Sequence, residues 1–109
     1  MYISITGIKT KSFFGMLKFM RYTLPSFTAA RKANGNLFCD SKKINNYYHT
    51  LTAWENRSKM MDYLRGKHHS SAMKNFRSIG TGSVYGYEDD LIPSWEDALK
   101  KWKENFKEI

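Results

Sequence analysis

The chain has 109 residues, a formal net charge of +8 at pH 7 and a single cysteine, Cys39. This length is enough for one domain with one hydrophobic core, and an aromatic content of 16% argues against extended disorder because such side chains have to be buried. One cysteine excludes an internal disulfide and makes a poor zinc site. The N-terminus lacks a secretory signal, and no segment approaches the roughly 20 apolar residues of a membrane span, so we expect a cytoplasmic protein.

Positive charge dominates the first third of the chain. Residues 1–39 contain no carboxylate, and Asp40 is the first acid. Such a field favours anionic partners, although a basic solvated surface is the alternative interpretation. No recognised nucleic-acid motif accompanies the charge, so nucleic acid is not the expected partner. The six basic residues of this segment are Lys9, Lys11, Lys18, Arg21, Arg31 and Lys32.

The first elements are a strand and a long helix. Residues 2–8 (YISITGI) alternate apolar and small polar side chains, as a half-buried strand does. Apolar residues then recur at helical spacing over residues 12–33, where Pro25 predicts a kink or a break. Gly35 is the natural left-handed residue to end this helix.

A β-hairpin is expected next. Residues 37–44 (LFCDSKKI) and 47–54 (YYHTLTAW) read as strands on either side of a tight turn at Asn45 and Asn46. Alternation in the second strand puts large residues on both faces, which suggests that both faces are covered. One face carries Tyr47, His49, Leu51 and Ala53, and the other carries Tyr48, Thr50, Thr52 and Trp54.

Two helical segments and a strand follow. Asn56 is a suitable N-cap for a short helix ending near Arg65. A second helical pattern places His69 on its apolar stripe. Gly80 and Gly82 are expected to end this helix before a strand over residues 83–88 (SVYGYE).

The last element is an amphipathic helix that begins at Ser94, an N-cap preceded by proline and followed by two acids. We therefore expect two parts in the chain: a ferredoxin-like body, residues 1–90, and a C-terminal helical segment, residues 91–109. This helix is expected to pack on the body or on a partner subunit. A dedicated peptide-binding or membrane-binding role is the alternative. Its expected apolar stripe consists of Trp95, Leu99, Trp102 and Phe106.

Together the elements predict an α+β protein of the ferredoxin-like type. The order βαββαβ specifies a four-stranded antiparallel sheet with helices on one face. The other face also needs cover, and self-association through it is the economical solution.

The sequence resembles the antibiotic biosynthesis monooxygenase (ABM)-like group of the dimeric α/β-barrel superfamily. The residues that carry this likeness are Leu51-Thr52-Ala53-Trp54-Glu55, Met61 to Leu64 and His68 to Phe76, and the element order agrees over residues 1–88. The resemblance implies a homodimer with a small apolar cavity in each subunit. It also implies cofactor-independent oxidation of a small aromatic or polyketide-like molecule.

Heme is not the expected cofactor. In the heme-degrading members of this superfamily a Trp and a His shape the heme site, and the matching positions here are Tyr63 and Met73. Neither residue fits. His69 lies one turn before Met73 and is a conceivable ligand, but the expectation is that no cofactor is held.

His69 is the candidate catalytic residue, because an imidazole titrates near neutrality and suits proton transfer. A satisfied, partly buried histidine is the alternative. The candidate substrate-binding residues are Trp54, Tyr63, Tyr85 and His49. No phosphate loop, zinc-hydrolase motif or Ser-His-Asp order is present. The competing functional hypothesis is a non-catalytic ligand-binding or regulatory module whose basic surface meets anionic partners.

Overall fold

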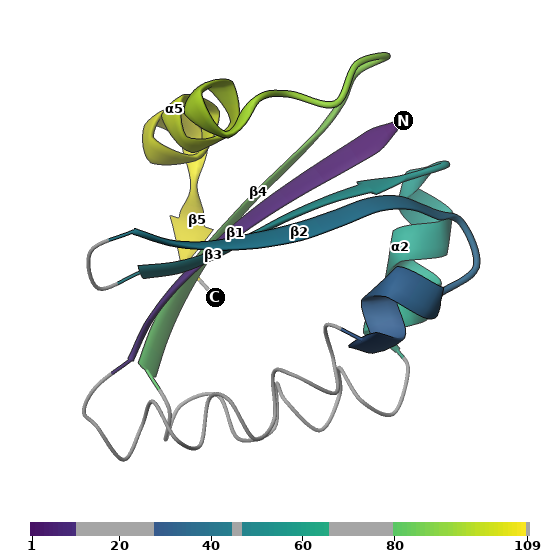
Figure 1. The fold of residues 1–109 in the computed structure, drawn as a ribbon, viewed down its shortest axis with the longest axis horizontal. Helices are drawn as coiled ribbons and strands as arrows, with labels where there is room; N and C mark the ends of the chain where they lie inside the picture. Colours follow the sequence, from purple (N-terminus) through teal and green to yellow (C-terminus); the bar gives the residue numbers. More distant parts are fainter. Residues whose placement is uncertain (11–27, 45–46, 66–79, 109) are drawn as a thin grey trace.

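A computed structural model describes residues 1–10, 28–44, 47–65 and 80–108 (Figure 1). Residues 28–32 form a short helical segment. The described residues also form five strands and two further helices, so the chain is an α+β protein, as predicted. The labelled elements are β1 (Tyr2–Thr10), β2 (Asn36–Ile44), β3 (Tyr47–Trp54), α2 (Arg57–Leu64), β4 (Gly80–Glu88), α5 (Trp95–Asn105) and β5 (Lys107–Glu108).

The strands form one antiparallel sheet in the order β2-β3-β1-β4-β5. The first four positions follow the predicted ferredoxin-like arrangement, with β1 between β3 and β4. The sheet has five strands, whereas the sequence predicts four, because Lys107 and Glu108 pair with Val84 and Ser83. This short strand extends the edge of β4.

The register of β1 sorts the side chains onto two faces. Ile3 lies opposite Ala53 and Tyr87, and Ile5 lies opposite Leu51 and Tyr85. This side is covered by α5, and we call it the α5 face (Figure 1). The opposite side, on which α2 and residues 28–32 lie, is called the α2 face.

Each face carries its own apolar cluster. On the α5 face Ile3, Ile5, Leu51 and Ala53 are buried against Ala98 and Trp102. On the α2 face Ala30, Trp54 and Met60 form a second cluster. The prediction that both faces of β3 are covered is therefore confirmed, since Leu51 to Trp54 are all buried.

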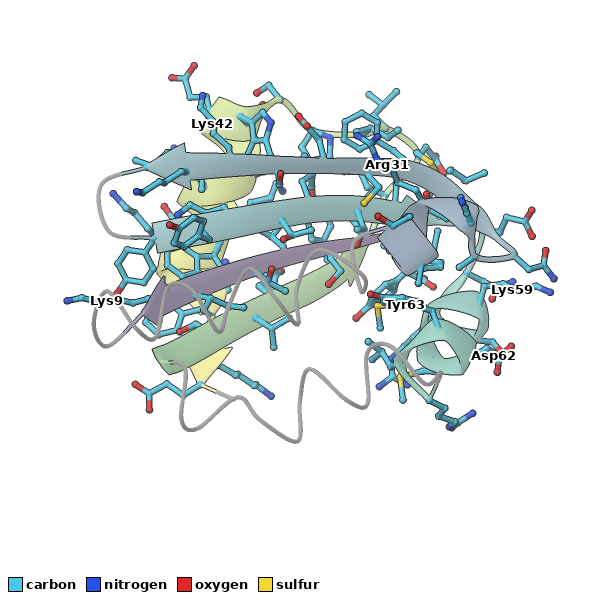
Figure 2. All side chains as sticks on the ribbon, turned by 60° about the horizontal axis from the view of Figure 1, so that its bottom comes forward. Lys9, Arg31, Lys42, Lys59, Asp62 and Tyr63 are labelled. Carbon is cyan, nitrogen blue, oxygen red and sulfur yellow. The ribbon has the colours of Figure 1, made fainter. Side chains whose placement is uncertain are left out.

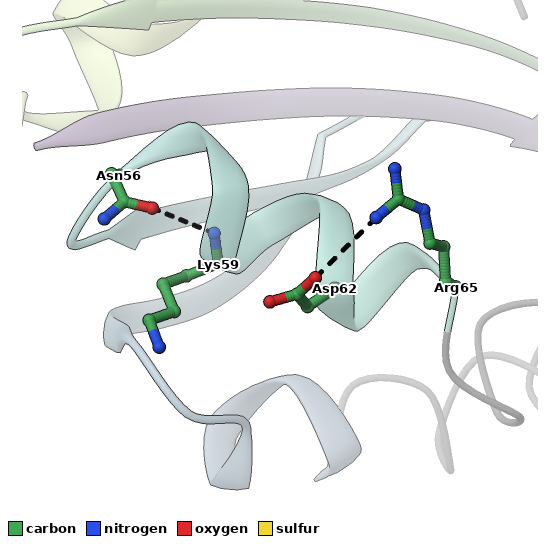
Figure 3. Close-up of polar contacts among 4 residues, drawn as sticks. All are labelled: Asn56, Lys59, Asp62 and Arg65. Carbon is green, nitrogen blue, oxygen red and sulfur yellow. Dashed lines mark hydrogen bonds and ion pairs between the residues drawn. The ribbon is translucent and has the colours of Figure 1, made fainter.

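Local side-chain chemistry explains where the helices begin. The Asn56 side chain accepts a hydrogen bond from the Lys59 backbone N–H at 3.0 Å (Figure 3). Ser94 accepts in the same way from the Asp97 N–H at 3.2 Å. Both predicted N-caps are thus confirmed. An exposed Asp62–Arg65 ion pair at 3.7 Å adds little to α2.

Three details differ from the sequence-based expectation or lie beyond the described residues. The strand expected over residues 83–88 begins earlier, because β4 already starts at Gly80 and pairs with the end of β1. Phe106 is not part of a buried stripe on α5: it follows the last helical residue in extended backbone and is 43% exposed. The hairpin turn expected at Asn45 and Asn46 lies outside the described residues.

Gly35 has φ 87°, so the predicted left-handed position is confirmed. Its carbonyl accepts a hydrogen bond from the Glu55 N–H at 2.8 Å, which joins the turn before β2 to the end of β3. None of the helices in the described part of the chain combines the length and the apolar character that a membrane span requires.

Candidate functional site

The α2 face holds an aromatic pair where β3 ends. Trp54 is the last residue of β3 and is 1% exposed, and Tyr63 on α2 stacks against it with ring centroids 5.3 Å apart and an interplanar angle of 27°. Figure 2 shows Tyr63 at this end of the sheet, with Lys9 at the opposite end. We call this group the Trp54 cluster, which consists of Ala30, Trp54 and Met60 with Tyr2, Ala33, Cys39, Met61, Tyr63 and Leu64 packed against them.

The indole N–H of Trp54 is buried, and among the described residues no acceptor lies within hydrogen-bond distance of it. An unsatisfied buried donor costs about 1–3 kcal/mol, and native structures leave few of them. The Nε1–H of Trp54 is therefore open to an acceptor from outside the described residues.

Cys39 lies beside this pair but does not supply a nucleophile. Burial raises the pKa of its thiol to about 11, and the neighbouring Arg31, which hydrogen-bonds to the thiol, offsets only part of that effect. The thiol is thus protonated near neutral pH, whereas the reactive form of cysteine is the thiolate. Arg31 brings a positive charge to the edge of the Trp54 cluster (Figure 2).

His49 belongs to the α5 face. It is 4% exposed, and its Nδ1 lies 3.1 Å from the Thr6 carbonyl oxygen, to which an Nδ1–H donates. Its ring stacks on Tyr47 and meets Trp102 edge to face at 4.8 Å. Burial lowers the pKa of His49, and the positive charge of Lys103 acts in the same direction. His49 is therefore a neutral, packed histidine that helps to seat α5.

Tyr85 also lies on the α5 face, stacked on Tyr87 with ring centroids 5.5 Å apart. The Tyr87 hydroxyl is buried and has no hydrogen-bond partner among the described residues. Burial is the main cause that raises its pKa, with the charge of Asp89 next.

The structure thus divides the predicted site residues between two faces. Trp54 and Tyr63 are in contact on the α2 face, while His49 and Tyr85 lie behind the sheet, on the α5 face. Strand alternation accounts for this division, since side chains at odd separations along β3 point to opposite faces. His69 lies outside the described residues, as does Met73.

One feature of the α5 face was not singled out from the sequence. Trp102 lies over Gly7, where the Cβ of any other residue would overlap its Cζ2 atom. An isolated glycine within a strand pattern is the signal that could have found this close approach. No group of three or more His, Cys, Asp or Glu side chains in the described ranges could hold a metal ion.

No family model matches the chain, and no curated protein matches it. Solved structures do match it, and they show that the chain has an ABM-like, ferredoxin-like fold.

Three of these structures illustrate the match. An antibiotic biosynthesis monooxygenase shares 10% identity at a TM-score of 0.73, over 84% of this chain and 100% of its own. Rv0793 from Mycobacterium tuberculosis shares 9% identity at a TM-score of 0.74, over 86% of this chain and 100% of its own. SnoaB, a cofactor-independent oxygenase from Streptomyces nogalater, shares 9% identity at a TM-score of 0.68, over 85% of this chain and 97% of its own. At these identities the likeness concerns the fold alone.

Proposed function

We propose that the chain is a cofactor-independent monooxygenase for a small aromatic or polyketide-like molecule, which binds at the Trp54 cluster. The observation that carries this proposal is the buried Nε1–H of Trp54, which lacks an acceptor among the described residues and belongs to an indole stacked on Tyr63. An aromatic ligand with an anionic oxygen would supply both the missing acceptor and a surface for stacking.

The chemistry follows from holding such an anion away from water. A substrate with an acidic CH₂ group loses one proton, and its delocalised anion reduces dioxygen. One oxygen atom replaces the two hydrogens of the CH₂ group as a carbonyl, and the other leaves as water with those hydrogens. Trp54 would donate to the substrate oxygen that carries the negative charge, where burial strengthens the bond. We assign the proton transfer to His69, following the sequence pattern.

We further propose that the chain works as a homodimer in the cytoplasm. The fold shared with the cofactor-independent oxygenase SnoaB supports an oxygenase of this kind. Self-association would use the apolar α5 face after α5 has left it. No resident metal or heme is part of the proposal.

Anthrone is a suitable probe because its CH₂ group is acidic and its oxidation consumes one dioxygen to give anthraquinone and water. Oxygen uptake is measured with an oxygen electrode, and the spontaneous rate is subtracted. The wild-type chain should accelerate uptake, and Trp54→Phe should lower kcat/KM about 10²-fold, as the loss of one oxyanion donor does.

Trp95→Phe is the matched control. It also removes an indole N–H, but that group donates to Asp40 on the other face of the sheet. Its kcat/KM should equal that of the wild type. If Trp54→Phe turns over anthrone as fast as Trp95→Phe, the indole has no role. Binding of anthrone without oxygen uptake would favour the non-catalytic ligand-binding module instead.

A further inference from the structure

Helix α5 closes the α5 face within a single chain. Beneath it Ile3, Ile5 and Ala53 are 0% exposed and Leu51 is 1% exposed. The helix contributes Ala98 and Trp102 to this cluster, and most of its other side chains are exposed and charged. The apolar centre of the sheet is therefore covered in cis by residues that follow the ferredoxin-like body.

Two indole groups fasten α5 across the sheet. Trp95 Nε1–H donates to the Asp40 carboxylate of β2 at 2.9 Å, and Trp102 Nε1–H donates to the Ser83 carbonyl of β4 at 3.2 Å. Between these two hydrogen bonds the Trp102 ring lies directly over Gly7, in the space that a Cβ would otherwise occupy, and we call this space the notch. Helix α5 therefore lies across one face of the sheet (Figure 1) and is bonded both to β2 and to β4.

The connection to α5 has the form of a hinge. Met1 and Asp89 exchange two backbone hydrogen bonds, of 2.9 and 3.0 Å, which fix the end of β4 beside the start of β1. Residues 90–94 then have no regular structure, and Leu91 is 75% exposed. A helix of 11 residues is marginal in isolation. Helix α5 can therefore leave together with β5, whose two residues pair with β4, while β2, β3, β1 and β4 keep their register.

We propose that α5 is an intramolecular cover that competes with a second copy of the chain for the α5 face. This inference rests on the homodimer proposed above and specifies how its assembly is controlled. With α5 docked the face is closed, and with α5 released it offers an apolar centre to the same face of another copy.

The composition of the exposed face fits a second copy. Partly buried aromatic side chains surround its apolar centre, and aromatic residues are enriched in protein interfaces. Release of Trp95 also frees the Asp40 carboxylate, and Lys42 lies two residues further along β2 on the same face. A twofold pairing can set each of these charges against its opposite on the other copy. These aromatic residues are Phe38, Tyr47, Tyr85 and Tyr87.

The test measures molar mass by light scattering over a range of concentrations, with the full-length chain. The wild type should pass from the 12.8 kDa monomer to the dimer as its concentration rises. Trp102→Ala, which empties the notch, should form dimers at concentrations at least tenfold lower. Lys100→Ala, an exposed change on the same helix, should match the wild type. A synthetic peptide of residues 90–109 should return the Trp102→Ala dimer to monomer.

Circular dichroism checks that each variant is folded, and Trp102→Phe replaces Trp102→Ala if the latter is not. The Phe variant keeps a ring in the notch but loses the bond to Ser83, so its shift should be smaller and in the same direction. Equal association of wild type and the Trp102 variants would overturn the proposal, as would a dimer that the peptide does not dissociate. Oxygen uptake with anthrone is read separately, so failure of the competition leaves the proposed reaction open to its own test.

Discussion

The Gly7→Ala substitution tests the packing of α5 on the sheet most directly. An alanine Cβ would overlap Cζ2 of Trp102 and lie 2.9 and 3.0 Å from Cε2 and Cη2 of the same ring. Ordinary carbon contacts are about 3.5–4.0 Å, so the indole must move. It is 6% exposed and bonded to the Ser83 carbonyl, which leaves it little room.

Overpacking of this kind costs about 1–3 kcal/mol, and the smaller conformational entropy of alanine in the unfolded chain offsets about 0.4–1 kcal/mol. The free energy of unfolding should therefore fall by about 1–2 kcal/mol in a urea titration, with the midpoint lowered and the slope m little changed. In a double-mutant cycle, Trp102→Phe should relieve part of the cost because a smaller ring leaves space for the methyl group.

Gly86→Ala is the matched control for this experiment. Its Cβ would meet the hydroxyl end of the half-buried Tyr2 side chain, which can rotate away more easily than the buried indole over Gly7. The loss should be smaller than for Gly7→Ala. If Gly7→Ala is as stable as the wild type, Trp102 does not fill the notch and the account of α5 is wrong.

Three further results are expected. Burial lowers the pKa of His49 below its ordinary 6.5, so the folded state binds this proton more weakly than the unfolded chain does. The free energy of unfolding, measured by urea titration, should therefore be complete above about pH 6.5 and decline as the pH falls. The decline should be less steep in His49→Gln. Asn56→Ala removes the acceptor for the Lys59 N–H and should cost about 1 kcal/mol, and an Ala that melts like the wild type would contradict the cap. Because burial raises the pKa of the Cys39 thiol to about 11, iodoacetamide at pH 8 should modify the native chain more slowly than the urea-unfolded chain.

Features set by neighbouring residues could be predicted from the sequence. Asn56 and Ser94 were identified as caps because a side-chain oxygen before an apolar pattern satisfies the first free N–H groups of a helix. The split of β3 into two faces also follows from alternation alone, and it separates His49 from Trp54. What alternation does not tell is which helix covers each face.

Features that depend on distant contacts could not be predicted. The strand β5 has two exposed residues, Lys107 and Glu108, and so carries no apolar pattern. Gly80 reads as a helix stop locally, but pairing with β1 holds it in β4. The rotation of α5 is set by the notch at Gly7, which admits the Trp102 ring and leaves Phe106 outside.

The three tryptophans offer a comparison within one chain. Trp95 and Trp102 donate their indole N–H groups to Asp40 and to the Ser83 carbonyl. Trp54, at 1% exposure the most buried of the three, has no acceptor among the described residues. Trp95 and Trp102 hold α5 in place with satisfied donors. The ligand proposed above would supply Trp54 with the acceptor that the described residues lack.

Substitution by phenylalanine separates these roles. In Trp95→Phe and Trp102→Phe a hydrogen bond is lost and its acceptor is left behind, at a cost of about 1–3 kcal/mol. Trp54→Phe loses about 1 kcal/mol to a small cavity. It also removes a donor that has no partner among the described residues, and such a donor costs about 1–3 kcal/mol if it stays unsatisfied. The ligand-free stability of Trp54→Phe should therefore lie within about 1 kcal/mol of the wild type. Urea titrations of the three variants measure this order. A Trp54→Phe loss larger than that of both other variants would mean that the Trp54 N–H is already paired in the folded chain, and the binding role assigned to it would fall.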